Sequence, residues 1–207
     1  MFNDIQYLLS TIDSQLLLAI NGWHSQLSDV IMFLFSDKIL WIPLYIMLFV
    51  VISRNKSRRN VILWMIAVVV CIVMTDQVTS GLLKPLVCRM RPSNPDNPLS
   101  VYIHTVFGYH GGSNGFPSSH AANSAGLTFF WFYTTRKKVI GWLLCGWMLI
   151  VCYSRMYLGV HYPSDILVGL IIGFVCARIM AYLYHFLSNL EWKGYLQNMY
   201  HLIESKV

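Results

Sequence analysis

Five hydrophobic runs dominate this sequence and restrict what it can fold into. They cover roughly residues 39–53, 60–83, 121–135, 139–155 and 164–187. With its flanks, each run approaches the ~20 residues that a membrane-spanning helix needs. Only 12% of the residues are charged and 56% are hydrophobic, whereas about a quarter of a soluble domain is charged. The sequence therefore predicts an all-α integral membrane helical bundle with no separate soluble domain.

A further region, residues 15–36, is ambiguous. Asn21 and Gly22 form a turn signal between two short apolar stretches. We expect these stretches to form two short helices, which either lie in the membrane interface or make one broken span. The prediction is thus five to six transmembrane helices in a single domain, residues 1–207, with short N-terminal helices over residues 1–36. The start of the chain has no basic region, so no cleaved signal peptide is expected.

Basic loops predict the orientation in the membrane. Residues 53–59 hold four basic residues and residues 136–138 hold three. Basic loops favour the cytoplasmic side, and two predicted spans separate these two loops, so both can face the cytoplasm together with residues 188–207. Residues 84–120 and 155–165 then lie on the external face, which is periplasmic in a bacterial inner membrane. The net charge of +6 is explained in part by this topology, and no nucleic-acid partner is expected.

Three polar segments fall on the predicted external face. They are Lys84 with Arg91-Pro92, Pro117-Ser118-Ser119-His120, and Ser154-Arg155 with His161 and Asp165. Their cations, and Arg89 beside them, lie on the side where positive charge is not needed for topology. Cations in this position indicate an anionic partner.

The first two segments suit a phosphate group. Lys84 would supply a mobile point charge and Arg91 a bidentate fork for phosphate oxygens. Ser118 and Ser119 are typical of a helix start, where free N–H groups bind phosphate, and His120 would lie in that first turn. Taken singly, the cations could equally snorkel to an interface, and the second segment could be a helix cap with an interfacial histidine.

The third segment suits nucleophilic catalysis. Asp165 is close enough in sequence to accept a hydrogen bond from one ring nitrogen of His161, which leaves the other nitrogen as a nucleophile. Arg155 adds another fork for phosphate. A structural His–Asp pair is the alternative. Because all three segments fall at helix ends on one face, together they predict cleavage of a phosphate ester or anhydride through a phosphohistidine.

The three segments together resemble the signature of the type 2 phosphatidic acid phosphatase superfamily. Its Lys-x6-Arg-Pro, Pro-Ser-x-His and Ser-Arg-x5-His-x3-Asp motifs correspond to KPLVCRMRP, PSSH and SRMYLGVHYPSD. The resemblance implies that His161 attacks phosphorus, that Asp165 orients His161, and that His120 protonates the leaving oxygen and then activates water. It further implies phosphate-binding roles, without metal or other cofactor, for Lys84, Arg91, Ser118, Ser119 and Arg155. Ser119 departs from the pattern, since this position is commonly Gly in the family.

The substrate is less defined by the sequence. A membrane lipid with a phosphate headgroup is expected as the partner, with undecaprenyl diphosphate slightly ahead of lipid A, phosphatidylglycerol phosphate and phosphatidic acid. A phosphotransferase and a non-catalytic lipid-binding or transport protein are alternatives on the same scaffold. The oligomeric state is left open.

Smaller features carry further expectations. Asp76 lies within the second run, and an intramembrane carboxylate usually has a partner; the sequence leaves open whether it supports the site or is hydrogen-bonded to other helices. The loop of residues 93–116 is long enough to be a lid or a binding loop. Gly169 and Gly173 form a small-residue pattern that indicates helix packing. His104 and His110 lack an accompanying carboxylate cluster, so no metal site is expected.

Overall fold

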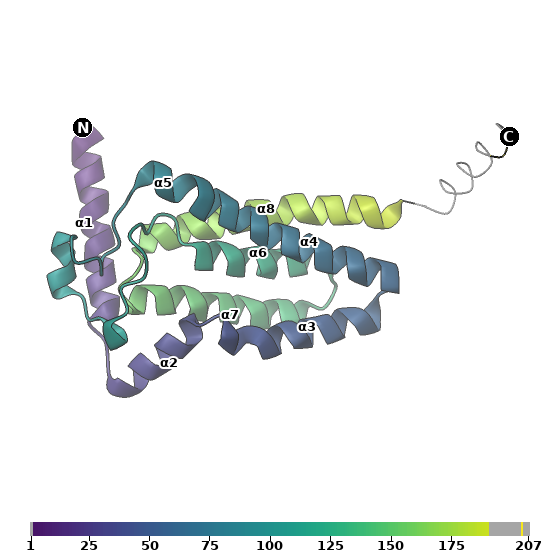
Figure 1. Cartoon of the computed structure of the whole chain (residues 1–207), viewed down its shortest axis with the longest axis horizontal. Coiled ribbons are helices and arrows are strands. Elements are labelled where there is room, and N and C mark those ends of the chain that lie inside the picture. The colour runs from purple at the N-terminus through teal and green to yellow at the C-terminus, as the bar shows by residue number, and fades with distance from the viewer. Residues whose placement is uncertain (1, 191–203, 205–207) are drawn as a thin grey trace.

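The computed structural model describes residues 2–190 and residue 204, and its regular elements are all helices within that part of the chain (Figure 1). The longer helices are α1 (Phe2–Asn21), α2 (Gln26–Ser36), α3 (Ile42–Asn55), α4 (Arg58–Asp76), α6 (Ser119–Thr134), α7 (Lys138–Tyr157) and α8 (Pro163–Asn189). Short elements join them: η1 (Ile39–Trp41), the π-helix η2 (Gln77–Leu83), α5 (Lys84–Val87), η3 (Pro98–Tyr102) and η4 (Val106–Gly108). The prediction of an all-α membrane bundle is confirmed.

The predicted number of spans is not confirmed. Among the described residues, three helical stretches are long and apolar enough to cross a membrane, Arg58–Val87, Lys138–Tyr157 and Pro163–Asn189. A fourth is possible if α2 and the stretch Ile39–Asn55, which meet at a bend of 72°, count as one broken span. The helices α3 and α6 have only 14 and 16 residues. At 1.5 Å per residue they are about 21 and 24 Å long, which is short of a ~30 Å hydrocarbon core.

Helix α6 lies at the centre of the bundle, and its tightest neighbour is α8. A side chain added at Gly169 would place its Cβ 2.5 Å from the carbonyl oxygen of Ser118, and one added at Gly173 would place it 2.3 Å from that of Ala122. Glycine is therefore required at both positions for the two backbones to approach so closely. This confirms the predicted packing role of the glycine pair. The contact also fixes the start of α6 against the first turns of α8.

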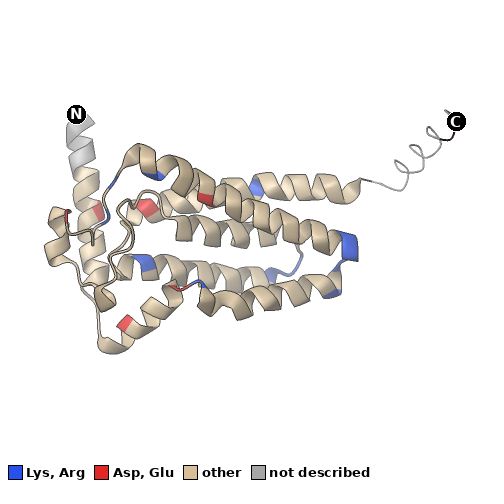
Figure 2. Cartoon of the chain, viewed as in Figure 1, with Lys and Arg blue, Asp and Glu red and all other residues tan. Residues whose placement is uncertain are grey.

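The two ends of the bundle differ in charge. Figure 2 shows Lys and Arg gathered at the connections from α3 to α4 and from α6 to α7, which lie at the same end of the bundle. The structure thus places the two basic loops together, as the topology prediction requires. Residues 191–203 and 205–207, which were expected on the same side, lie outside the described residues.

The N-terminal helix α1 crosses the other end of the bundle (Figure 1). It begins at Phe2, well before the expected start near residue 15. Its last residue, Asn21, donates hydrogen bonds from its side-chain amide to the carbonyl oxygens of His104 and Tyr157, at 2.9 and 2.7 Å. The amide oxygen of Asn21 accepts a bond from the N–H of His104 at 2.8 Å. The loop of residues 93–116 is therefore tied to α1 and α7.

Candidate active site

The three polar segments meet at the α1 end of the bundle because each lies at a helix end. Lys84 begins α5, where the π-helix returns to α-helical geometry. Ser118 is the N-cap of α6, and Arg155 lies in the last turn of α7. His161 precedes α8, and Asp165 lies in its first turn. The structure thus gathers residues that are up to 81 positions apart in the sequence.

His161 and Asp165 form a buried pair. The Nδ1 atom of His161 lies 3.4 Å from Oδ2 of Asp165, and the two side chains are 1% and 0% exposed. The same Oδ2 accepts a hydrogen bond from the N–H of Tyr162 at 2.9 Å, while Oδ1 accepts one from Arg89 at 2.7 Å. At this distance Nδ1 forms no hydrogen bond among the described residues, but the carboxylate is held on both oxygens and faces the Nδ1 side of the imidazole. The Nε2 nitrogen is then the one left for chemistry.

The charge state of His161 follows from its surroundings. Burial, followed by the charges of Arg155, Arg91 and Lys84, lowers the pKa of His161 well below its usual range. The imidazole is therefore neutral at pH 7, and the neutral form is the one with a nucleophilic lone pair.

Lys84 reaches Ser119 rather than a carboxylate. Its Nζ atom donates hydrogen bonds to the hydroxyl oxygens of Ser119 at 2.8 Å and Ser80 at 3.3 Å. The hydroxyl of Ser119 also accepts a bond from Thr79 at 2.9 Å. Ser80 donates in turn to Asp76 at 3.3 Å. The Ser119 hydroxyl, which the usual Gly would lack, therefore fixes the position of Lys84, and Asp76 reaches Lys84 through Ser80.

The two site arginines are buried but incompletely hydrogen-bonded. Arg91 is 8% exposed and Arg155 is 2% exposed. Within the described part of the chain, the Nη1 atom of Arg91 and the Nε atom of Arg155 have no hydrogen-bond partner. Among the described residues, neither arginine nor Lys84 forms an ion pair with a carboxylate. Since a buried charge without a partner is costly, the cluster is arranged for an anion.

Neighbouring groups hold the two guanidinium groups in place. Arg155 donates to the hydroxyl of Ser36 and to that of Tyr109, the latter at 3.2 Å. Arg91 donates from Nε to the carbonyl oxygen of Asn114 at 3.2 Å. Gly111, at a φ of +67°, lies so close to Arg91 that a Cβ would come within 2.3 Å of its Nη1. The loop of residues 93–116 therefore forms one wall of the site.

Ser118 contributes differently from the sequence expectation. Its N–H donates to the carbonyl oxygen of Asp165 at 3.0 Å, so this group is not free for a phosphate. Its hydroxyl accepts from the N–H of Ala121 at 3.4 Å and caps α6. The first-turn N–H groups of Ser119 and His120 lack intrahelical acceptors, as at any helix start, and are the ones that remain.

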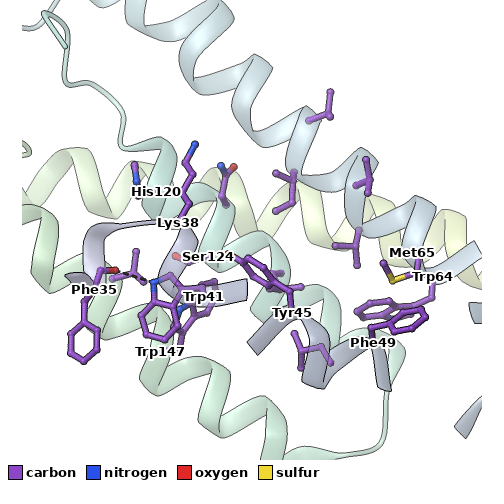
Figure 3. A pocket seen from close by; sticks show the side chains of 18 of the residues that line it. Phe35, Lys38, Trp41, Tyr45, Phe49, Trp64, Met65, His120, Ser124 and Trp147 are labelled. Atoms are coloured by element: carbon purple, nitrogen blue, oxygen red, sulfur yellow. Dashed lines mark hydrogen bonds between the residues drawn. The ribbon is translucent and has the colours of Figure 1, made fainter. Parts of the chain in front are cut away.

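His120 marks the boundary between the cation cluster and an apolar chamber. The chamber has a volume of about 420 Å³ and lies between α3, α4, α6 and α7. Figure 3 shows His120 and Lys38 close together in this pocket, with Tyr45, Phe49 and Trp64 farther along it. None of Lys84, Arg91 or Arg155 lines the chamber. The site therefore has a cationic side and an apolar side, with His120 between them.

Sequence reasoning missed the residues that hold Asp165. Arg89 bridges two carboxylates, since it contacts Asp165 and also donates to Asp13 of α1. Asp13 accepts from the backbone N–H of Ser164 at 2.8 Å and from its hydroxyl. The Arg89 guanidinium lies 3.8 Å from the centroid of the Tyr162 ring. The sequence marked Arg89 as an external cation without linking it to Asp165, and no sequence signal links Asp13 to a segment 76 residues away.

Comparisons with known proteins agree with this geometry. A model of the PAP2 superfamily matches residues 63–188. A lipid A 4'-phosphatase from Bacteroides thetaiotaomicron is 41% identical over 165 residues, which cover 80% of this chain and 73% of the relative. An undecaprenyl-diphosphatase from Bacillus subtilis is 26% identical, over 75% of this chain and 76% of the relative. The crystal structure of a PAP2-type phosphatidylglycerolphosphate phosphatase from Bacillus subtilis has the same fold, with a TM-score of 0.63 at 19% identity, covering 89% of this chain and 90% of that one.

Proposed function

Because this chain belongs to the PAP2 superfamily and is a lipid phosphatase, we propose that it removes the 4'-phosphate of lipid A through a phosphohistidine. The observation that carries the reaction class is the cluster of Lys84, Arg91 and Arg155 around His161. These three cations have no carboxylate partner among the described residues, and His161 is held neutral. An anion with several peripheral oxygens, such as phosphate, complements this arrangement.

The proposed reaction has two steps. The Nε2 atom of His161 attacks phosphorus and the bond between phosphorus and the lipid oxygen breaks. His120, which takes up a proton when the phosphate anion binds beside it, donates that proton to the lipid oxygen. Water then attacks the phosphohistidine with His120 accepting its proton, which releases inorganic phosphate and restores the imidazole. Asp165 holds the ring, and Lys84, Arg91 and Arg155 stabilise the charge on the phosphoryl oxygens. Ser119 fixes Lys84, while Ser118 holds the start of α6.

The proposed substrate rests on the relatives rather than on the cation cluster. The sequence expectation put undecaprenyl diphosphate first. The Bacteroides thetaiotaomicron relative named a lipid A 4'-phosphatase is 41% identical, whereas the Bacillus subtilis relative named an undecaprenyl-diphosphatase is 26% identical. Lipid A is therefore the better-supported substrate, and undecaprenyl diphosphate becomes the second candidate. A bacterial inner membrane with the site facing the periplasm is the location we propose, since both basic loops lie at the opposite end of the bundle.

The test is phosphate release by detergent-purified protein in the presence of EDTA. The panel consists of bisphosphorylated lipid A, undecaprenyl diphosphate, phosphatidylglycerol phosphate and phosphatidic acid, each assayed beside His161→Ala. Release from lipid A alone, with fragment masses that show loss of the 4'-phosphate, supports the proposal. Preferential release from another lipid would replace lipid A as the substrate. No release above the variant from any lipid would contradict hydrolysis and favour phosphotransfer or binding, which product analysis with an added acceptor separates.

A further inference from the structure

We propose that Lys38 and the apolar chamber beside His120 form a leaving-group subsite, in which Lys38 binds an anionic oxygen of the departing lipid and the chamber holds its hydrocarbon chain. The inference rests on the proposed phosphohistidine chemistry for the position of the scissile phosphate. It concerns the second candidate substrate, a polyprenyl diphosphate, because only a diphosphate has an anionic oxygen on the departing group beside the scissile bond. It adds a specificity-determining residue that lies outside residues 63–188, the part of the chain matched by the superfamily.

The position of the subsite follows from the chemistry of the first step. In an in-line displacement the leaving oxygen lies opposite the nucleophile, and the proton donor lies beside that oxygen. His161 is the proposed nucleophile and His120 the proposed donor. The part of the substrate that departs must then extend past His120. The space that it enters is the chamber, which His120 lines together with Asn123 and Ser124 of the same helix.

The chamber walls suit a hydrocarbon chain. Its lining includes Leu48, Val68, Ile72, Leu127 and Val151, and no carboxylate. Such a wall gains free energy by covering methylene groups, at about 0.8 kcal/mol per buried group. The only cation in the lining is Lys38, and it lies at the His120 end of the chamber (Figure 3). The chamber therefore has the polarity of a single-chain anionic lipid, with charge at one end and hydrocarbon along the rest.

The hinge between α2 and α3 positions Lys38. The chain bends by 72° between Ser36 and Ile39. On one side of the bend, Ser36 accepts a hydrogen bond from Arg155, so the hinge contacts the cation cluster. Asp37 uses its carboxylate to cap the N–H of Ile39 at 3.0 Å, and Lys38 forms no ion pair among the described residues. The Lys38 ammonium is therefore available to a ligand beside His120.

A binding experiment tests Lys38 without turnover. In the His161→Ala background, the dissociation constants of farnesyl diphosphate and farnesyl monophosphate are measured by calorimetry in detergent. Only the diphosphate carries a second phosphate on the leaving side. Lys38→Met should weaken diphosphate binding by about tenfold or more, as expected for a lost charge-assisted contact, and monophosphate binding by less than twofold. Lys38→Arg should restore most of the difference.

A second pair of variants tests the chamber itself. Val69 lines the chamber, whereas its neighbour Val70 does not, and both side chains are more than a third exposed. Val69→Trp should fill the chamber and weaken binding of both farnesyl ligands at least fivefold, while Val70→Trp should leave binding unchanged.

Three results would overturn the proposal. They are an equal effect of Lys38→Met on both ligands, no effect of Val69→Trp, or no binding of either ligand to the protein that retains Lys38. Because binding is measured with a variant that cannot form the phosphohistidine, these results are independent of the hydrolysis assay. A protein that binds both ligands selectively but releases no phosphate would retain the subsite and lose the proposed function.

Discussion

The segment from Lys84 to Asp165 and the N-terminal segment up to Asn55 build the same site in different ways. The first supplies every group proposed to touch the transferred phosphoryl group, and three of its cations, Lys84, Arg91 and Arg155, lack carboxylate partners among the described residues. The second supplies groups that surround these: Asp13 holds Arg89, Ser36 contacts Arg155, and Lys38 lines the chamber. The superfamily match begins at residue 63. The groups proposed for the reaction thus lie in the first segment, and the N-terminal segment supplies groups that hold them in place and part of the proposed substrate subsite.

The largest effect is expected when the carboxylate beside His161 is removed. Asp165→Asn should lower kcat by about 10³-fold or more, because the amide no longer fixes the tautomer that exposes Nε2. It should also release Arg89, which bonds to Oδ1. Steady-state phosphate release from the preferred lipid measures the effect.

Asp96→Asn is the matched control for this variant. Asp96 is an exposed carboxylate in the loop after Arg91, so its replacement should change kcat by less than twofold. A comparable loss in both variants would mean that general charge, rather than the His161–Asp165 pair, controls the rate.

A smaller effect is expected when Asp13 of α1, which contacts Arg89 and Ser164, loses its charge. Asp13→Asn should lower kcat by about 10- to 100-fold with little change in KM, because Arg89 and Ser164 lose a charged acceptor and no longer hold the start of α8. The split between kcat and KM separates positioning of Asp165 from substrate binding. Kinetics on the preferred lipid, beside melting curves, measure it.

Asp13→Glu provides the corresponding rescue. It retains the charge at a longer reach, so it should recover part of kcat. If Asp13→Asn lowered only the melting temperature and left kcat unchanged, α1 would be a structural clamp without influence on the chemistry.

The residues between Lys84 and Asp165 could be predicted from the sequence more fully than those of the N-terminal segment. His161, Asp165, His120 and the three cations were predicted from residue type and spacing, because phosphate chemistry restricts both. The five hydrophobic runs likewise predicted five of the helices. Asp13 and Lys38 could not be found in this way, because a single carboxylate or lysine in an N-terminal segment has no spacing rule. Their contacts depend on where α1 and the hinge lie in three dimensions.

The predicted number of spans is not confirmed for a related reason. A hydrophobic run predicts a helix but not where the helix ends. The apolar run of α6 leads directly from the PSSH segment, so the start of this helix belongs to the site, and only 16 residues remain for the bundle. The hinge at Lys38 similarly divides α2 from α3. Residues that the site or the hinge uses at a helix end are not available to lengthen the part of that helix that crosses the membrane.

The contact between α6 and α8 gives a prediction of moderate size. Gly169→Ala should destabilise the protein by about 1–3 kcal/mol, because the new Cβ would lie 2.5 Å from the carbonyl oxygen of Ser118. Since Ser118 also binds the backbone of Asp165, activity should fall as well. Thermal or denaturant unfolding in detergent, together with kcat, measures both.

Gly146→Ala is a control that should raise stability, whereas Gly169→Ala should lower it. A Cβ at Gly146 would meet nothing within 4 Å, so this change in α7 should leave activity intact and stabilise the helix by about 0.5–1 kcal/mol. If Gly169→Ala were as harmless as Gly146→Ala, the helices could separate without disturbing the site, and close packing would not position the two motifs.

The smallest expected effect concerns pH and the charge state of the buried His161. The pKa of His161 is lowered well below its usual range, first by burial and then by Arg155, Arg91 and Lys84. In the unfolded chain a histidine has a pKa of about 6.5. As the pH falls through that value, the unfolded state gains a proton that the folded state does not, so the protein should lose stability. For one titrating group, the free energy of unfolding cannot change by more than about 1.4 kcal/mol per pH unit.

The measurement is denaturant unfolding of the protein and of His161→Gln between pH 7.5 and 5. The glutamine keeps a polar side chain but cannot titrate, so the variant should lose stability less steeply below pH 6.5. Parallel slopes would mean that His161 takes up a proton in the folded state at these pH values. The imidazole would then be cationic in the acid range, and kcat/KM would fall there as well, because a protonated ring cannot attack phosphorus.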